Sequence, residues 1–306
     1  MLIRKEISIL LYTLFFMTIQ VAADETDSNL LNKLSPEVVA AMEGNQKNLD
    51  SIKTMQAGVK TITKYDYGDE GSYELIETQR IIYDCNHFRI DKLETKFIGD
   101  EKYKNHGSEQ GTIDIDSKES NIDYYPSNDH VFIRPPEWSN SYKIRNNPLL
   151  KYQSARNATL KNNIMLSAKN GFFFTAQSDK VDGEECILLQ CDYTNPDAIL
   201  KIWVVPSKGY CIKKIEDIVN GSISEEYTTI LKKHPQGFWW FDSVETKTIS
   251  SILTANTSLS VSSITLNEQI DPELFSVWGM GLSSKTRIYD EIQNTNYTLA
   301  IDEEDN

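Results

Sequence analysis

From residue 57 onward, apolar and polar positions alternate in short runs separated by Gly, Asn, Asp and Pro. This period of two is typical of β-strands joined by turns. The predicted strands are 57–67, 73–84, 87–96, 112–116, 121–125, 130–133, 171–177, 185–193, 200–205, 210–220, 222–232, 238–250 and 258–266. The short connections predict an antiparallel meander. Because the composition does not change between the early and the late strands, we expect one domain.

Local turn and cap residues support these elements. Asn220-Gly221 and Asp182-Gly183 stand between strand-like runs and tolerate the positive φ that tight hairpins need. Before the strands, Ser35-Pro36-Glu37 predicts the start of a helix, with Ser as N-cap and Pro at the first helical position. Apolar residues near helical spacing extend this helix, or two short ones, to about Met55.

The first 23 residues have the pattern of a secretory signal peptide. Arg4 and Lys5 precede an apolar run that starts at Ile7, and the small residues Ala22 and Ala23 favour cleavage after Ala23. The apolar run of about 13 residues is shorter than a membrane span, so we expect no stable membrane insertion after cleavage. These features predict a protein of the periplasm, or a secreted one, with a flexible acidic leader at 24–34 and an acidic tail at 296–306.

The charge balance excludes one class of partner. The chain of 306 residues carries 31 Lys and Arg against 45 Asp and Glu, a net charge of −14. A nucleic-acid-binding protein needs clustered basic residues, so we expect no nucleic-acid partner. The 40% hydrophobic content is that of a folded domain rather than a disordered chain.

Motifs of catalysis and of cofactor binding are missing from the sequence. It contains no GxSxG, Walker, GxGxxG or HExxH motif, and its four histidines are scattered singly. The acidic run from Asp114 to Glu119 lacks the central Gly of a calcium loop and is interpreted as a solvated loop. We therefore predict no enzymatic activity, no cofactor and no metal site.

The four cysteines leave two interpretations open. In an exported protein, Cys85, Cys186, Cys191 and Cys211 can form disulfides in any of three pairings, between which the sequence does not choose. Alternatively they are buried free thiols. Their spacing does not match the paired CxxC of a zinc site.

Aromatic residues concentrate on the late strands. Continuous apolar runs indicate strands that are covered on both faces, and one of those faces can line a cavity for a lipid chain. The residues predicted to line it are Phe172, Phe174, Trp203, Leu231 and Trp239. The alternative is an ordinary hydrophobic core, and a slip of one residue would exchange the lining for the outer face.

Five segments in order carry a resemblance to a known family. They are 181–186, 203–210, 237–240, 267–275 and 281–290. Their order of strands and turns resembles the exported LolA-like proteins, the lipoprotein-carrier superfamily. The resemblance implies an α+β fold over 35–295, an unclosed antiparallel β half-barrel of about 11 strands. Helices would cap its concave face, which would hold acyl chains.

Two functions follow as hypotheses. The first is a non-enzymatic carrier that binds a lipid or an acylated lipoprotein in the apolar cavity. The second is an envelope sensor or regulatory module of the same fold, which binds a peptide or lipid signal and contacts a membrane-protein partner through its acidic surface.

Overall fold

The computed structural model describes residues 27–100, 102–103, 110–117, 119–136, 154–155, 158–194 and 197–299. The predicted signal peptide and most of the predicted acidic tail lie outside these ranges. In the described residues, no helix combines the length and the apolar character that crossing a membrane requires.

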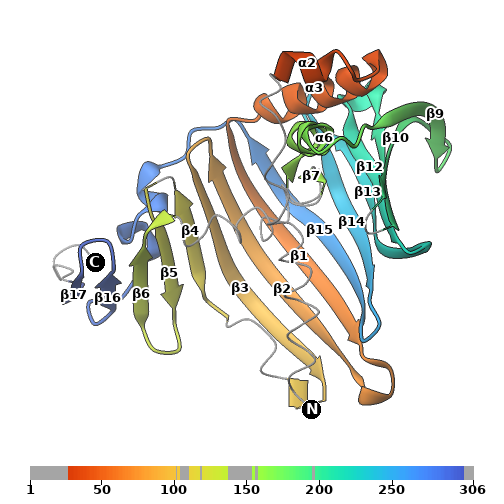
Figure 1. Cartoon of the computed structure of the whole chain (residues 1–306). Helices are drawn as coiled ribbons and strands as arrows, with labels where there is room; N and C mark the ends of the chain where they lie inside the picture. The colour runs from red at the N-terminus through yellow and green to blue at the C-terminus, as the bar shows by residue number, and fades with distance from the viewer. Residues whose placement is uncertain are drawn as a thin grey trace.

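One open sheet dominates the molecule (Figure 1). It contains fifteen strands in the order β17-β16-β6-β5-β4-β3-β2-β1-β15-β14-β13-β12-β11-β10-β9, and its two ends do not pair with each other in the described chain. The strands of the first half are β1 (Thr54–Asp66), β2 (Ser72–Asp84), β3 (His87–Gly99), β4 (Ile113–Ser117), β5 (Asn121–Tyr125) and β6 (His130–Arg134). Those of the second half are β9 (Thr175–Val181), β10 (Glu184–Thr194), β11 (Asp197–Val205), β12 (Cys211–Val219), β13 (Ser222–Lys233), β14 (Trp239–Ile249), β15 (Thr254–Leu266), β16 (Arg287–Asp290) and β17 (Thr295–Thr298). A separate pair joins β7 (Ser154–Ala155) to β8 (Ala158–Thr159).

The predicted meander is confirmed for most strands, with two corrections. The sheet has fifteen strands instead of about 11, and it is mixed, because β16 pairs in parallel with β6. Strands β16 and β17 were not predicted, since four residues are too few to show a period of two. Strand β9 begins at Thr175, four residues later than the predicted strand at 171–177.

The hairpin turns have the predicted backbone conformation. Asn220 and Gly221 both have positive φ, 51° and 75°, between β12 and β13. Asp182 and Gly183, with φ of 52° and 80°, join β9 to β10 in the same way. Two consecutive residues with positive φ match the right-handed twist of the strands that they connect.

Three helices cover part of one face of the sheet, at one end of its strands (Figure 1). They are α2 (Asp27–Leu31), α3 (Pro36–Asp50) and α6 (Leu160–Lys169). Helix α3 starts as predicted, with the Ser35 Oγ accepting the backbone N–H of Val38 at 3.4 Å. Helix α6 was not predicted. Helix α2 lies in the segment expected to be a flexible leader, and Leu30 is fully buried there.

The two faces of the sheet have different cores. On the helix-covered face, Ile81 of β2 belongs to the core that includes α2, α3 and α6. On the opposite face, Ile82 belongs to a second core closed by residues 270–282, which contain two 3-10 turns, Pro272–Phe275 and Trp278–Met280. This second core extends to Leu299, so ordered packing continues past the predicted domain end at 295.

Candidate binding site on the helix-covered face

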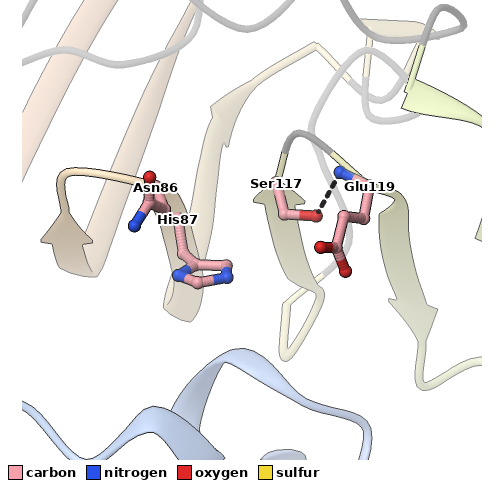
Figure 2. A pocket seen from close by; sticks show the side chains of 4 residues that line it. All are labelled: Asn86, His87, Ser117 and Glu119. Carbon is pink, nitrogen blue, oxygen red and sulfur yellow. Dashed lines mark hydrogen bonds between the residues drawn. The ribbon is translucent and has the colours of Figure 1, made fainter.

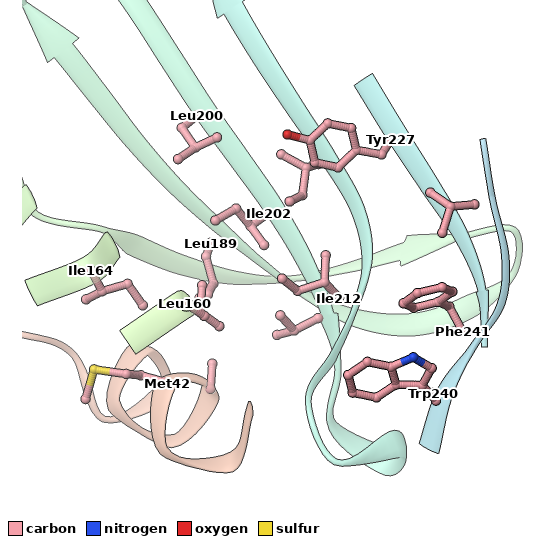
Figure 3. Close-up of a cluster of buried hydrophobic side chains, with 14 of the residues drawn as sticks. Met42, Leu160, Ile164, Leu189, Leu200, Ile202, Ile212, Tyr227, Trp240 and Phe241 are labelled. Atoms are coloured by element: carbon pink, nitrogen blue, oxygen red, sulfur yellow. The ribbon is translucent and has the colours of Figure 1, made fainter. Parts of the chain in front are cut away.

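The helix-covered face of β10 to β15 carries a continuous apolar surface. Because side chains alternate along a strand, every second residue of neighbouring strands points to the helices. Across the strands, Leu189 pairs with Ile202, Ile202 with Ile215, and Ile215 with Tyr227. All four are buried, and Figure 3 shows three of them, Leu189 of β10, Ile202 of β11 and Tyr227 of β13. Val244 and Leu259 extend this surface across β14 and β15.

The helices meet this surface with apolar side chains of their own. Met42 of α3 and Leu160 and Ile164 of α6 belong to this core and lie on the left in Figure 3, on the same side as Leu189. Each fully buried side chain of this size contributes about 1.5–3 kcal/mol to folding. From α6, Ser167 Oγ forms a hydrogen bond with the hydroxyl of Tyr193 at 2.9 Å. Most of the buried side chains of α6 are apolar, so hydrophobic burial supplies most of what holds this helix on the sheet.

Helix α3 adds a row of amides on its side toward β12 and β14. Asn45 Nδ2 donates to the carbonyl oxygen of Tyr210 at 3.0 Å. Asn48 Nδ2 lies 3.3 Å from both the carbonyl oxygen of Trp239 and the Sγ of Cys211. Gly44 packs so closely on the ring of Tyr210 that an added Cβ would lie 2.1 Å from a ring carbon. We call Gly44, Asn45, Asn48, Tyr210 and Trp239 the amide seam.

None of the four cysteines forms a disulfide, so the interpretation as buried thiols holds for three of them. Cys186, Cys191 and Cys211 are buried, and Cys85 is exposed. Burial raises the pKa of the Cys211 thiol to about 12, which keeps it protonated at neutral pH.

The structure places only part of the predicted cavity lining on the helix-covered face. Phe174 is buried in that core, and Phe172 packs against it and lies 5.1 Å from the ring of Tyr193. Trp203 lies on the opposite face, packed with Cys186 and Leu188. Its Nε1 donates to Asp179 Oδ2 at 2.7 Å.

The remaining two predicted residues lie at the borders of the apolar surface. Leu231 packs against the core on each face. Trp239 is half-buried, with the ammonium of Lys208 4.9 Å from its ring centre. Its neighbours Trp240 and Phe241 are the buried rings of this strand. The register shifts there, with Ile230 opposite Ser243 and Leu231 opposite Phe241, so Asp242 is an extra residue. A bulge of this kind breaks the alternation on which the prediction depended.

A polar cluster occupies the same face of the sheet on β4, β5 and β6, beyond the helices. Arg134 Nη1 donates to Asp123 Oδ2 at 2.6 Å, and its guanidinium lies 4.7 Å from the ring centre of Phe132. Asp114 stands directly opposite Asp123, and burial raises its pKa to about 6. Asp114 and Asp116 therefore belong to strand β4, and the interpretation of this run as a solvated loop was wrong for them. The strand predicted at 112–116, which rests on the alternation of these acids with Ile113 and Ile115, is the interpretation that the structure confirms.

A shallow polar depression of about 290 Å³ lies near the β2–β3 and β4–β5 turns, lined by Asn86, His87, Ser117 and Glu119 (Figure 2). The Oδ1 of Asp84 lies 3.0 Å from Nδ1 of His87, within hydrogen-bonding distance. Ser117 Oγ accepts the N–H of Glu119 at 3.1 Å and is 3.0 Å from the carbonyl oxygen of Ser120. The hydroxyl of Ser117 is thus engaged within its own turn rather than with His87. Within the described ranges, no group of three or more His, Cys, Asp or Glu side chains is arranged to hold a metal ion.

Comparison with known proteins gives structural neighbours only. No family model matches the chain, and no curated protein matches it. Its structure is similar to that of a putative outer membrane lipoprotein-sorting protein domain from Vibrio parahaemolyticus, with 13% identity, 79% of this chain and 99% of that chain covered, and a TM-score of 0.47. It is also similar to a LolA superfamily protein from Nitrosomonas europaea, with 12% identity, 77% and 97% covered, and a TM-score of 0.44. A DUF1329 family protein from Desulfovibrio piger matches with 11% identity, 80% and 100% covered, and a TM-score of 0.41.

Proposed function

We propose that this protein is a non-enzymatic carrier that holds the acyl chain of a lipid or lipoprotein between its helices and the apolar surface of β10 to β15. The observation that carries this proposal is the extent of that surface, which runs across six neighbouring strands and is covered by three short helices. Sites for lipid-like ligands are mostly apolar, with a small number of polar groups that fix the orientation.

The contacts that hold the helices on the sheet are consistent with helices that can move away from it. Helix α6 has ten residues and contacts the sheet mainly through apolar side chains. An acyl chain inserted between the helices and the sheet offers each of them the apolar contacts that they now give each other. Insertion therefore keeps both apolar faces buried and costs little hydrophobic free energy.

The first 23 residues and the net charge of the chain fit an exported carrier. The basic, apolar and small residues of 1–23 have the order of a secretory signal peptide. The net charge of −14 opposes lasting adhesion to anionic lipid surfaces. A carrier in the periplasm needs this property in order to leave the membrane with its cargo.

Native mass spectrometry of the protein purified from its own envelope tests the proposal. We expect an added mass that corresponds to a lipid or an acylated species, and displacement of a fluorescent fatty acid by that species in solution. A clean apo mass together with no binding of the fluorescent fatty acid would falsify it.

Two neighbouring residues provide a matched pair of variants. Ile202→Phe adds volume on the helix-covered face, whereas Leu188→Phe adds it on the opposite face of the adjoining strand. We expect the first variant to weaken fatty-acid binding about tenfold or more, and the second to leave it unchanged at equal folded fraction. Equal binding by both variants contradicts a site on the helix-covered face.

A further inference from the structure

The polar depression near the β2–β3 and β4–β5 turns lies on the face opposite to the helices. His87 pairs with Ser117 across β3 and β4, and its ring stacks on Phe275 with the ring centroids 5.0 Å apart. Phe275 belongs to the core of the opposite face. The depression has about 290 Å³ of space and is lined by Asn86, His87, Ser117 and Glu119 (Figure 2). It is therefore a small open site that is separate from the proposed acyl site.

Asp84 holds the ring of His87 in one orientation and in one tautomer. Both carboxylate oxygens of Asp84 lie 3.0 Å from Nδ1 of His87. Oδ1 also accepts the backbone N–H groups of Asn86 at 2.8 Å and of His87 at 2.7 Å. Burial acts to raise the pKa of Asp84, but these hydrogen bonds outweigh burial and lower the pKa below its ordinary value. Because an ionised carboxylate only accepts, Nδ1 carries the hydrogen, and Nε2 of the neutral ring is an acceptor.

The groups that face this space are mainly hydrogen-bond acceptors. Figure 2 shows the ring of His87 extending from its turn toward Ser117 and Glu119. The hydroxyl of Ser117 donates to the carbonyl oxygen of Ser120 at 3.0 Å, so it has no hydrogen left for a ligand. Within the described residues, no side chain pairs with Nε2 of His87 or with the carboxylate of Glu119. The site therefore offers a neutral acceptor, a charged acceptor and the amide of Asn86.

The chemistry of these groups selects a cation with N–H donors. A primary ammonium group carries three N–H donors and a positive charge, which complement both acceptors. A carboxylate or a phosphate would bring acceptors against acceptors. Zinc sites take three or four protein ligands, whereas this lining supplies one imidazole and one carboxylate. The net charge of −14 adds a long-range attraction for cations.

We infer that this depression binds a primary ammonium group, with Nε2 of His87 and the carboxylate of Glu119 as its acceptors. The inference goes beyond the proposed function, because the site lies on the other face of the sheet from the acyl chain. The ammonium group is that of a lysine side chain or of a free amine, since both present the same three donors. Because the two sites are on different faces, the amine binds whether or not a lipid is present.

Three lysine derivatives of equal side-chain length test the site. Nα-acetyl-lysine amide has a charge and three N–H donors on its side chain, its Nε-trimethyl form keeps only the charge, and its Nε-acetyl form loses the charge. The backbone amide shifts of Asn86, Ser117 and Glu119 in NMR titrations measure the affinity for each derivative. We expect lysine to bind about tenfold more tightly than trimethyl-lysine, since charge-assisted hydrogen bonds separate the two. The acetylated form should bind most weakly.

Two substitutions separate the roles of the two acceptors. His87→Phe keeps a ring against Phe275 and removes Nε2, so lysine binding should fall about tenfold while trimethyl-lysine binding stays unchanged. Glu119→Gln removes the charge, so both charged derivatives should bind about tenfold more weakly. Glu43→Gln is the control, because Glu43 is exposed on α3 and the variant loses the same charge on the other side of the sheet. It should leave all three affinities unchanged.

Two results overturn the inference. Equal affinities of the native protein for lysine and trimethyl-lysine mean that the depression is only an acidic surface. An equal loss in Glu43→Gln and Glu119→Gln means that net charge alone attracts the amine. Unfolding midpoints check that the variants are folded; if His87→Phe is not folded, the preference of the native protein and the Glu119→Gln variant decide.

The result is distinguishable from that of the proposed function. Glu119→Gln should bind the fluorescent fatty acid as the native protein does, and a loss in this variant alone contradicts two separate sites. No fatty-acid binding by either protein overturns the carrier function and leaves the ammonium site in place. Titration with putrescine and with a lysine-containing peptide identifies the source of the ammonium group. Tighter binding of the peptide assigns the site to a partner protein, and tighter binding of putrescine assigns it to a free amine.

Discussion

The sheet is covered on both faces, and the two covers are attached in different ways. On the opposite face, residues 270–282 are held by a buried guanidinium. Arg89, 2% exposed, donates from Nη1 to the carbonyl oxygens of Leu274 at 2.5 Å and Gly279 at 2.8 Å. Its Nε donates to Asp91 Oδ1 at 2.5 Å. On the helix-covered face, the attachment includes apolar contacts, the neutral amides of the amide seam and the hydroxyl pair of Ser167 and Tyr193.

This difference separates a fixed cover from one that can open. Hydrogen bonds to charged groups are about twice as strong as neutral ones, and removing a buried charge partner is costly. Neutral amides and apolar contacts can be replaced by water or by a ligand at a lower cost. The contrast agrees with a binding site under the helices and a permanent core under residues 270–282.

The largest expected effect comes from removing the guanidinium. Arg89→Met leaves two carbonyl oxygens without their donor, and we expect the free energy of unfolding to fall by about 3–5 kcal/mol. Urea denaturation measures this loss, and amide hydrogen exchange should show opening of 270–282 before that of α3. Arg80→Met is the control, because Arg80 binds the same Asp91 but its side chain is 44% exposed. An equal loss in both variants would refute the special role of Arg89.

The substitution Gly44→Ala should weaken the attachment of α3 to the helix-covered face. An added Cβ would lie 2.1 Å from a ring carbon of Tyr210, whereas alanine gains about 1 kcal/mol of helix propensity. Overpacking costs up to about 3 kcal/mol, so we expect a net loss of about 2 kcal/mol. Hydrogen exchange should increase in α3 and stay constant in 270–282. Tyr210→Ala in the same chain should restore part of the loss; no restoration means that the ring is not the cause.

Asp114 lies on the same face as the helices but beyond them, and it makes the stability of the protein depend on pH. The pKa of Asp114 is raised from 3.8 to about 6, so the folded state binds more protons than the unfolded state between these values. This group therefore favours folding below pH 3.8, and that contribution is lost as the pH rises through about 6. Asp114→Asn should raise the free energy of unfolding at pH 7 by about 1.5 kcal/mol, with little change at pH 3.5. Denaturation curves at both pH values check this, and a gain of equal size at both contradicts the assignment.

The smallest expected effect concerns the start of α3. Ser35→Ala removes the side chain that accepts the N–H of Val38. We expect a loss of about 0.5–1 kcal/mol, because the cap bond is exposed to solvent on one side and long. Ser35→Asp keeps a capping oxygen and should retain the native midpoint of thermal unfolding. A loss in Ser35→Asp equal to that in Ser35→Ala indicates that the cap contributes nothing.

Much of the fold follows from local patterns in the sequence. Strands such as 121–125 and 222–232 were located by alternation, and the N-cap of α3 by Ser35 with Pro36. These features depend on residues within a few positions of each other, so the sequence alone contains them. The hairpin at Asn220-Gly221 belongs to the same class.

The site itself depended on long-range geometry. Alternation could not assign Trp240 and Phe241 to the core in place of Trp239, because the bulge at Asp242 is specified by pairing with β13. The sequence likewise gave no sign that residues 270–282 would close the opposite face, since Arg89 and Gly279 are 190 positions apart. Sequence patterns thus determined most of the strands and the start of α3. Only tertiary packing decided which face each aromatic residue joins, because this depends on partners distant in the chain.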